Sequence, residues 1–311
     1  MKSAPFYEDI IGAADPGETS WWVTSDDVRI RLGVWNSDAP MGTVLLFPGR
    51  TEYIEKYAPT ATFLDARGFA TLVVDWRGQG LSDRDNHNPL VGHVATFEAF
   101  QHDVDTVMRA AAEMNLPKPY YLLGHSMGGC IGLRALMSGL DVKAASFTGP
   151  MWGINIPAHK RHAAWTVSAL AHKFGRGKNL TPSTSENTYV LAEPFNNNML
   201  TTDKASFEWM RHQVMTHPDL ALGGPSYSWL FQALRECKSL ARLPSPHVPC
   251  LTFLGTDERI VVQEAVKTRM QKWPDGELIM VSGAEHEILM ENPKTLEHVR
   301  DRLTEFFAAH A

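Results

Sequence analysis

The pentapeptide Gly124-His125-Ser126-Met127-Gly128 fits the pattern G-x-S-x-G, in which small residues flank a serine. The pattern alone carries little weight, because glycine and serine are common residues. Its surroundings make it informative, since an apolar run at 120–123 precedes it directly and a helical pattern over 127–140 follows. A serine on such a sharp, strained strand-to-helix turn can attack a carbonyl carbon. We therefore predict that Ser126 is the nucleophile of an acyl-transfer reaction.

A serine hydroxyl is too weak an acid to react without a general base. The sequence has 13 histidines, and most of them are explained as surface or packing residues. His286 differs, because it follows the last predicted strand, 277–281, within the segment Gly283-Ala284-Glu285-His286. In triads of this kind the serine, the acid and the histidine follow one another along the chain, with the histidine after the last strand. His286 is therefore the predicted general base.

The acid of the triad is open between two adjacent carboxylates, Asp257 and Glu258, which follow the apolar run 250–254. Adjacent loop residues can point in opposite directions, so one of the two is expected to reach His286. The spacing from Gly255 favours Glu258, whereas Asp257 is the commoner residue type but lies one step out of register. Glutamate is an accepted acid in this triad, and we favour Glu258.

The turn after the first buried strand is expected to supply part of an oxyanion hole. That turn is Phe47-Pro48-Gly49-Arg50-Thr51-Glu52. By position, the backbone N–H groups of Arg50 and Met127 should bind the oxyanion that forms when Ser126 attacks. An ordinary Pro-Gly turn would explain the same segment without a catalytic role.

Short apolar runs alternate with amphipathic helical segments along most of the chain, and these elements must position the site. Strands are predicted at 43–47, 70–75, 120–123, 144–148, 250–254 and 277–281, after an antiparallel pair at 21–23 and 28–35. Helices are predicted at 54–67, 97–114, 127–140, 262–273 and at the end of the chain to about 309. This alternation predicts an α/β fold with a mostly parallel central sheet flanked by helices.

The alternation of predicted strands and helices is interrupted between residues 151 and 244. Helical segments rich in tryptophan, methionine and histidine replace it there, without a strand pattern. We predict a core formed by 1–150 and 245–311, interrupted by a helical cap at 151–244.

Composition excludes several classes of function. A formal net charge of −6 and the lack of a basic run argue against a nucleic-acid partner. The three cysteines are far apart and form no CxxC pair, which argues against a zinc site or a disulfide framework. No secretory leader and no membrane-spanning run is visible, so a cytoplasmic location is expected.

Four motifs in order, at 47–52, 75–82, 124–129 and 283–286, resemble the monoacylglycerol lipase and bacterial lysophospholipase family of α/β-hydrolases. The cap segments 198–203 and 222–225 resemble the bacterial lysophospholipase cap. The resemblance implies an α/β-hydrolase fold and a serine esterase that cleaves a single-chain lipid ester through an acyl-enzyme, with no cofactor and no metal. Pro48 departs from the family pattern, which commonly has histidine there.

The resemblance also implies that Glu52 and Lys56 lie near the polar head of the substrate, although a solvated helix N-terminus explains them equally well. Aromatic residues of the cap are candidates for an acyl pocket, although the cap's own core explains most of them; they are Trp152, Trp165, Phe174, Trp209 and Trp229. The segment 163–171 is apolar enough for transient contact with a membrane surface.

Two other functions remain open. A small-molecule carboxylesterase or an aminopeptidase-like amidase would use the same fold and triad. A non-catalytic, hydrolase-like binding protein is the more remote alternative, since it would be expected to lack part of the triad. The sequence makes no prediction of oligomeric state.

Overall fold

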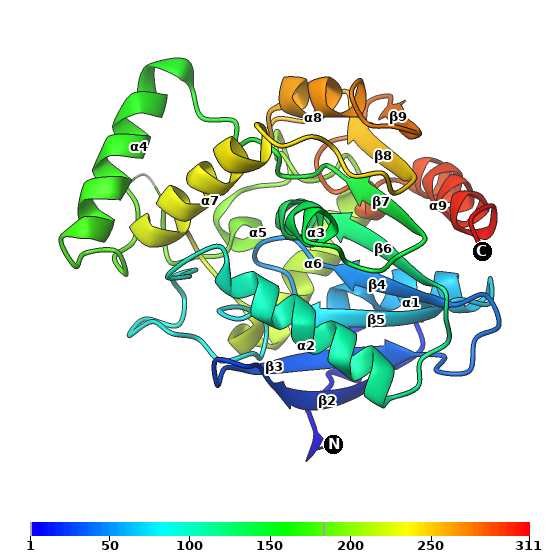
Figure 1. Cartoon of the computed structure of the whole chain (residues 1–311). Coiled ribbons are helices and arrows are strands. Elements are labelled where there is room, and N and C mark those ends of the chain that lie inside the picture. Colours follow the sequence, from blue (N-terminus) through cyan, green and yellow to red (C-terminus); the bar gives the residue numbers. More distant parts are fainter. Residues whose placement is uncertain (1, 183) are drawn as a thin grey trace.

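The computed structural model describes residues 2–182 and 184–311 and contains one nine-stranded sheet (Figure 1). The strand order across the sheet is β1-β2-β3-β5-β4-β6-β7-β8-β9. The strands are β1 (Lys2–Ser3), β2 (Glu18–Val23), β3 (Arg29–Trp35), β4 (Thr43–Phe47), β5 (Ala70–Asp75), β6 (Tyr120–His125), β7 (Ala144–Thr148), β8 (Cys250–Gly255) and β9 (Gly276–Val281). Pairing is antiparallel from β1 to β5 and parallel from β5 to β9. The predicted α/β-hydrolase architecture with a mostly parallel sheet is confirmed.

Helices cover both faces of this sheet. They are α1 (Ala58–Asp65), α2 (Ala99–Glu113), α3 (Met127–Met137), α4 (Ala158–Lys173), α5 (Tyr189–Ala192), α6 (Lys204–Thr216), α7 (Tyr227–Leu240), α8 (Gln263–Met270) and α9 (Pro293–Ala308). Short 3-10 turns lie at η1 (Glu8–Ile10), η2 (Ile54–Tyr57), η3 (Pro218–Leu220) and η4 (Ile288–Met290). The helix predicted at 54–67 is divided into η2 and α1, because Pro59 stands in the first turn of α1 and has no N–H to continue a helix from the preceding turn.

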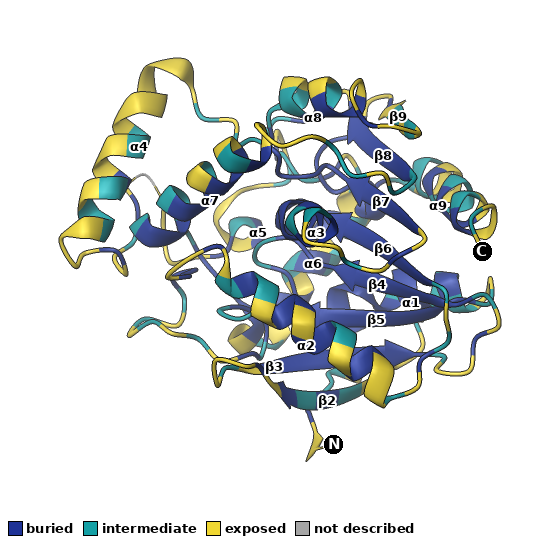
Figure 2. Ribbon diagram, in the orientation of Figure 1, coloured by how far each residue is buried: buried dark blue, intermediate teal, exposed yellow. Residues whose placement is uncertain are grey.

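Two apolar cores lie on opposite faces of the sheet. Successive side chains of a strand point to opposite faces, so in β4 Leu45 and Phe47 enter one core while Val44 and Leu46 enter the other. Helices α2, α3 and α8 cover the first core, and α1 and α9 cover the second. Burial on both faces explains why the central strands are continuous apolar runs, and Figure 2 shows them buried along their length.

Helices α4 to α7 lie between β7 and β8 in the chain, in the segment predicted to form the cap. Helix α7 packs against α3 and adds Trp229 and Ala233 to the first core, whereas α6 belongs to a separate apolar cluster around Phe207. Helix α4 packs against α7 and is otherwise mostly exposed (Figures 1 and 2). Whether 151–244 acts as a separate cap stays a prediction. Among the described residues, no helix is long and apolar enough to cross a membrane.

Candidate active site

Ser126 lies at the sharp turn between β6 and α3, with a backbone φ of +49°. A residue with a side chain rarely adopts this conformation, and it costs on the order of 1–3 kcal/mol unless the surroundings impose it. The turn is packed tightly, since a Cβ on Gly128 would collide with the carbonyl oxygen of Phe47. Glycine at 128 therefore lets the turn approach the end of β4, and the strand and helix hold the Ser126 side chain at the carboxyl edge of the sheet.

Three side chains from separate loops form a hydrogen-bonded relay. His286 Nε2 lies 2.8 Å from Ser126 Oγ, and His286 Nδ1 lies 2.6 Å from Glu258 Oε2. The three residues are 9%, 4% and 4% exposed in the order Ser126, His286 and Glu258. If Nδ1 carries the proton shared with the carboxylate, Nε2 is free to accept the hydroxyl proton. The arrangement can therefore activate a serine for attack on a carbonyl carbon.

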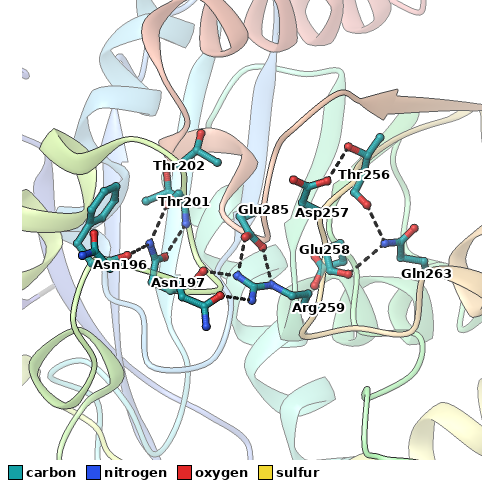
Figure 3. A pocket seen from close by; sticks show the side chains of 12 residues that line it. Asn196, Asn197, Thr201, Thr202, Thr256, Asp257, Glu258, Arg259, Gln263 and Glu285 are labelled. Atoms are coloured by element: carbon teal, nitrogen blue, oxygen red, sulfur yellow. Dashed lines mark hydrogen bonds and ion pairs between the residues drawn. The ribbon is translucent and has the colours of Figure 1, made fainter.

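The structure distinguishes the two candidate acids. The other oxygen of Glu258, Oε1, accepts hydrogen bonds from the backbone N–H groups of Ile260 (2.6 Å) and Val261 (3.0 Å). Burial disfavours the charged carboxylate, but the interactions with His286 and these N–H groups outweigh burial and lower the pKa of Glu258. Asp257 is exposed and hydrogen-bonds with Thr256 Oγ1 instead (Figure 3). Glu258 is thus the carboxylate that contacts His286.

Arg259, which the sequence analysis did not single out, connects the loops around the relay (Figure 3). Its guanidinium pairs with Glu285 at 2.6 Å, next to His286, and donates to Asn197 Oδ1 at 3.0 Å. The ion pair and hydrogen bond lie in an open cavity of about 690 Å³ on the outer side of the Glu258 loop, away from Ser126. In the sequence, the only indication of a role for Arg259 is that it directly follows Glu258. Its partners Asn197 and Glu285 are distant along the chain, so the sequence does not indicate these contacts.

The turn after β4 lies against the Ser126 turn, as expected for an oxyanion hole. Both polar backbone groups of Gly49 are hydrogen-bonded. Its N–H donates to the Glu52 carboxylate, and its C=O accepts a hydrogen bond from Gln79 Nε2 at 2.7 Å. In the described part of the chain, the backbone N–H groups of Arg50 and Met127 donate to no protein acceptor. Met127 also begins α3, where the helix dipole favours negative charge.

Glu52 and Lys56 line a cavity of about 760 Å³ together with Ser126 and His286. They are buried, so the alternative of a solvated helix N-terminus is wrong. Lys56 Nζ lies 2.6 Å from Glu52 Oε1 and 2.8 Å from Glu287 Oε1. Burial alone would lower the pKa of Lys56, but the two carboxylates raise it.

His125 stands beside this buried ion cluster. Its Nε2 lies 3.4 Å from Glu287 and 3.5 Å from Glu52, so the three residues have metal-ligand spacing. The set does not fit a metal ion, because the Lys56 ammonium already lies between the two carboxylates and would repel a second cation.

The prediction for Trp152 is corrected by the structure. This side chain lies outside the cavity, stacked on Trp273 and edge-on to Phe147, and its Nε1 donates to the Gly129 carbonyl at 3.1 Å. Trp152 follows the end of β7 by four residues and packs in the sheet core, although the predicted cap begins at residue 151. Among the other aromatic candidates, Trp229 lines the cavity and Phe174 is 70% exposed.

Many of the described residues that line the larger cavity are apolar. They include Met151, Ile154, Val190, Leu200, Met210, Val214, Leu222, Trp229, Ile260 and Val261. A volume of about 760 Å³ is in the range of cavities that enclose small-molecule ligands. The arrangement provides a nucleophile, a buried ion cluster and apolar lining residues in one cavity.

A hydrogen-bonded serine and histidine on a strand–turn–helix elbow of this sheet are the features of serine hydrolases of the α/β-hydrolase fold. The chain belongs to the family described as serine aminopeptidase S33, whose model matches residues 38–293. The expected family class is thereby confirmed.

Individual relatives extend this comparison over most of the chain. Lysophospholipase L2 of Escherichia coli is 28% identical over 296 residues, covering 92% of this chain and 86% of the relative. A probable lysophospholipase L2 of Haemophilus influenzae is 25% identical and covers 85% of this chain and 82% of the relative. A soluble variant of monoglyceride lipase from Saccharomyces cerevisiae, solved with a substrate analog, has the same fold, with a TM-score of 0.75 at 18% identity and 99% coverage of both chains.

Proposed function

We propose that this protein hydrolyses carboxylic esters of single-chain lipids through an acyl-enzyme. The observation that carries the proposal is the relay of Ser126, His286 and Glu258, which opens into a cavity lined by many apolar residues. Such a lining suits an acyl chain, because burial of apolar surface is favourable at about 25 cal/mol per Å². Similarity to two lysophospholipases supports the same substrate class.

In the proposed mechanism, His286 takes the proton from Ser126 as the hydroxyl attacks the ester carbonyl. The N–H groups of Arg50 and Met127 bind the oxyanion of the tetrahedral intermediate. His286 then gives the proton to the leaving alcohol, and water hydrolyses the acyl-enzyme. Glu258 holds the imidazole in the required tautomer and stabilises its charged form.

The two ends of the substrate are assigned to different residues of the cavity. The acyl chain lies against apolar residues such as Met210 and Val214. The polar head lies toward Glu52 and Lys56, whose buried charges compensate one another. We propose that a small polar head displaces solvent from this cluster without breaking the ion pairs.

The helices α4 to α7 are proposed to form the lid of this cavity. Helix α4 and the residue that follows it expose Val167, Leu170 and Phe174, while Lys160 and Lys173 lie on the same element. Exposed apolar side chains with basic neighbours favour transient contact with an anionic lipid surface. All three cysteines are free and buried, which supports the proposed reducing, cytoplasmic environment.

The test is release of free fatty acid from a monoacylglycerol and from a lysophospholipid of equal chain length, with Ser126→Ala as the blank. Hydrolysis of either lipid by the wild type, lost in the variant, supports the proposal. Cleavage of a short aryl ester without cleavage of either lipid would move the substrate to small esters, and cleavage of N-terminal amides would favour an amidase. Full activity in Ser126→Ala would refute the mechanism.

A further inference from the structure

Two basic side chains line the larger cavity, those of Arg50 and Lys56. Their electrostatic surroundings differ. Lys56 is held between the carboxylates of Glu52 and Glu287. Arg50 forms no ion pair with any carboxylate that the structure describes, although its Nε is shielded from solvent and has no hydrogen-bond partner. Burial of an unpaired charge is unfavourable, so the Arg50 guanidinium is a candidate site for an anion that enters the cavity.

Arg50 is held in place by neutral groups. Its Nη2 donates to the carbonyl of Gly223 at 2.5 Å, and its Cζ lies 5.1 Å from the centre of the Trp229 ring. These contacts orient the guanidinium without neutralising it. Burial lowers the pKa of Arg50 to about 10, so the side chain is protonated at neutral pH.

The neighbouring wall is polar. Gly224, the residue after the carbonyl partner of Arg50, donates its N–H to the carbonyl of Ser185 at 2.7 Å. Ser185 belongs to the segment 184–188, from which Thr184, Ser185, Asn187 and Thr188 line the cavity. Hydroxyl and amide groups are typical donors to a phosphate oxygen, and this segment supplies them to the same cavity that Arg50 lines.

Other arginines lack carboxylate partners but lie elsewhere. Arg84, for example, donates to the carbonyls of Ala221 at 2.9 Å and Asp219 at 2.7 Å, and it does not line the cavity. The lack of a carboxylate therefore has a ligand-binding consequence at Arg50, which lines the cavity, and only a structural one at Arg84, which does not.

We propose that the Arg50 guanidinium binds the phosphodiester of a lysophospholipid, which makes the negatively charged head group the preferred substrate class over the neutral glycerol of a monoacylglycerol. This inference rests on the proposed ester hydrolase function and deepens it. In a lysophospholipid, the glycerol unit places the phosphate only a few bonds from the ester. In an arginine residue, the guanidinium lies at a similar distance from the backbone N–H. One residue would thus contact the oxyanion through its backbone and the phosphate through its side chain.

The test is the ratio of kcat/KM for palmitoyl lysophosphatidylglycerol to that for palmitoyl glycerol, each below its critical micelle concentration. A ratio cancels any effect of a substitution on the triad or on the oxyanion hole that both substrates share. Arg50→Gln should lower the ratio by about 10- to 100-fold, the value of a charge-assisted hydrogen bond. Arg84→Gln is the matched control, because it removes a guanidinium that binds cap carbonyls outside the cavity, and its ratio should stay within about twofold.

A second measurement uses the wild-type protein, so it does not depend on how a variant folds. Glycerol 3-phosphate, inorganic phosphate and glycerol are compared as competitive inhibitors of aryl ester hydrolysis. We expect glycerol 3-phosphate to inhibit at a concentration at least about tenfold lower than glycerol. Equal inhibition by glycerol and glycerol 3-phosphate would overturn the proposal for Arg50, even if neither lipid were a substrate. A lack of hydrolysis of both lipids would instead overturn the proposed lipid function.

The source of the anion is distinguished by combining the two measurements. A lowered substrate ratio in Arg50→Gln, with stronger inhibition by glycerol 3-phosphate than by inorganic phosphate, supports head-group recognition. An unchanged ratio with equal inhibition by the two phosphates would identify a free-anion site and contradict the proposal.

Discussion

Replacement of Glu258 by glutamine tests the triad with little change in shape. Glu258 Oε1 accepts two backbone N–H groups, from Ile260 and Val261, while Oε2 faces His286 Nδ1. In Glu258→Gln the amide oxygen must remain at the Oε1 position, because an NH₂ group there would oppose two N–H donors. The NH₂ group is therefore forced to face Nδ1.

That orientation fixes the wrong tautomer of His286. An NH₂ group donates, so Nδ1 must accept, and the ring proton moves to Nε2. Nε2 lies 2.8 Å from Ser126 Oγ and would then donate to the hydroxyl instead of accepting its proton. In serine proteases the corresponding amide substitution lowers kcat by about 10⁴, or roughly 5.5 kcal/mol. We expect a loss on the order of 10³–10⁴ in kcat.

The assay is steady-state hydrolysis of a short aryl ester, with stability measured by urea denaturation of the same preparations. Asp257→Asn is the matched control, because Asp257 is adjacent, exposed and contacts Thr256 instead of His286. We expect that control to keep kcat within about twofold. The reasoning is refuted if Glu258→Gln keeps more than about a tenth of the wild-type kcat, or if Asp257→Asn loses as much activity as Glu258→Gln.

Three further predictions concern charges outside the relay. Arg31→Met removes the cation between two fully buried carboxylates, Glu55 and Asp75, and should lower the free energy of unfolding in urea by about 3–5 kcal/mol. Burial alone would lower the pKa of His125, but two neighbouring carboxylates raise it. The contribution of protonated His125 to stability is therefore complete below about pH 6.5 and is lost as the pH rises through its folded-state pKa. His125→Gln should reduce this pH dependence of the melting temperature, measured by thermal denaturation from about pH 6 to 9. Arg259→Gln should speed amide hydrogen exchange in the segment 197–201 while costing at most about 1 kcal/mol, since the arginine is partly exposed.

Each of these predictions has a contrasting control or outcome. Arg29 forms an exposed ion pair with Asp83, so Arg29→Gln should change the free energy of unfolding by about 1 kcal/mol or less. An equal loss in Arg29→Gln and Arg31→Met would show that burial is not the cause. Parallel pH profiles in wild type and His125→Gln would argue against the titration, and unchanged hydrogen exchange in Arg259→Gln would argue against the connection between loops.

The central strands could be predicted from the sequence because the environment imposes an unambiguous pattern on them. The runs 43–47, 70–75 and 144–148 coincide with β4, β5 and β7, whose residues are all buried. Burial on both faces produces continuous apolar runs, which turn residues then delimit. The two-residue β1 is too short and exposed to produce a pattern.

The site could be predicted only as far as local sequence determines it. The position of Ser126 follows from the strand, turn and helix around it. The choice between Asp257 and Glu258 depends on the direction of each loop side chain, and the contact of Lys56 with Glu287 depends on two distant segments meeting. Trp152 was placed wrongly because its residue type suits an acyl pocket as well as a core, and only packing against Trp273 distinguishes the two.

The backbone conformation of Ser126 has a consequence for how this sequence evolves. A φ of +49° is accessible to glycine at little cost but strains a residue with a side chain. Selection for thermal stability alone would therefore favour a change from serine to glycine at this position. The folded state and the proposed chemistry make opposite demands on one residue, so a laboratory lineage selected only for heat resistance is expected to lose its nucleophile early, whereas selection for turnover would retain it.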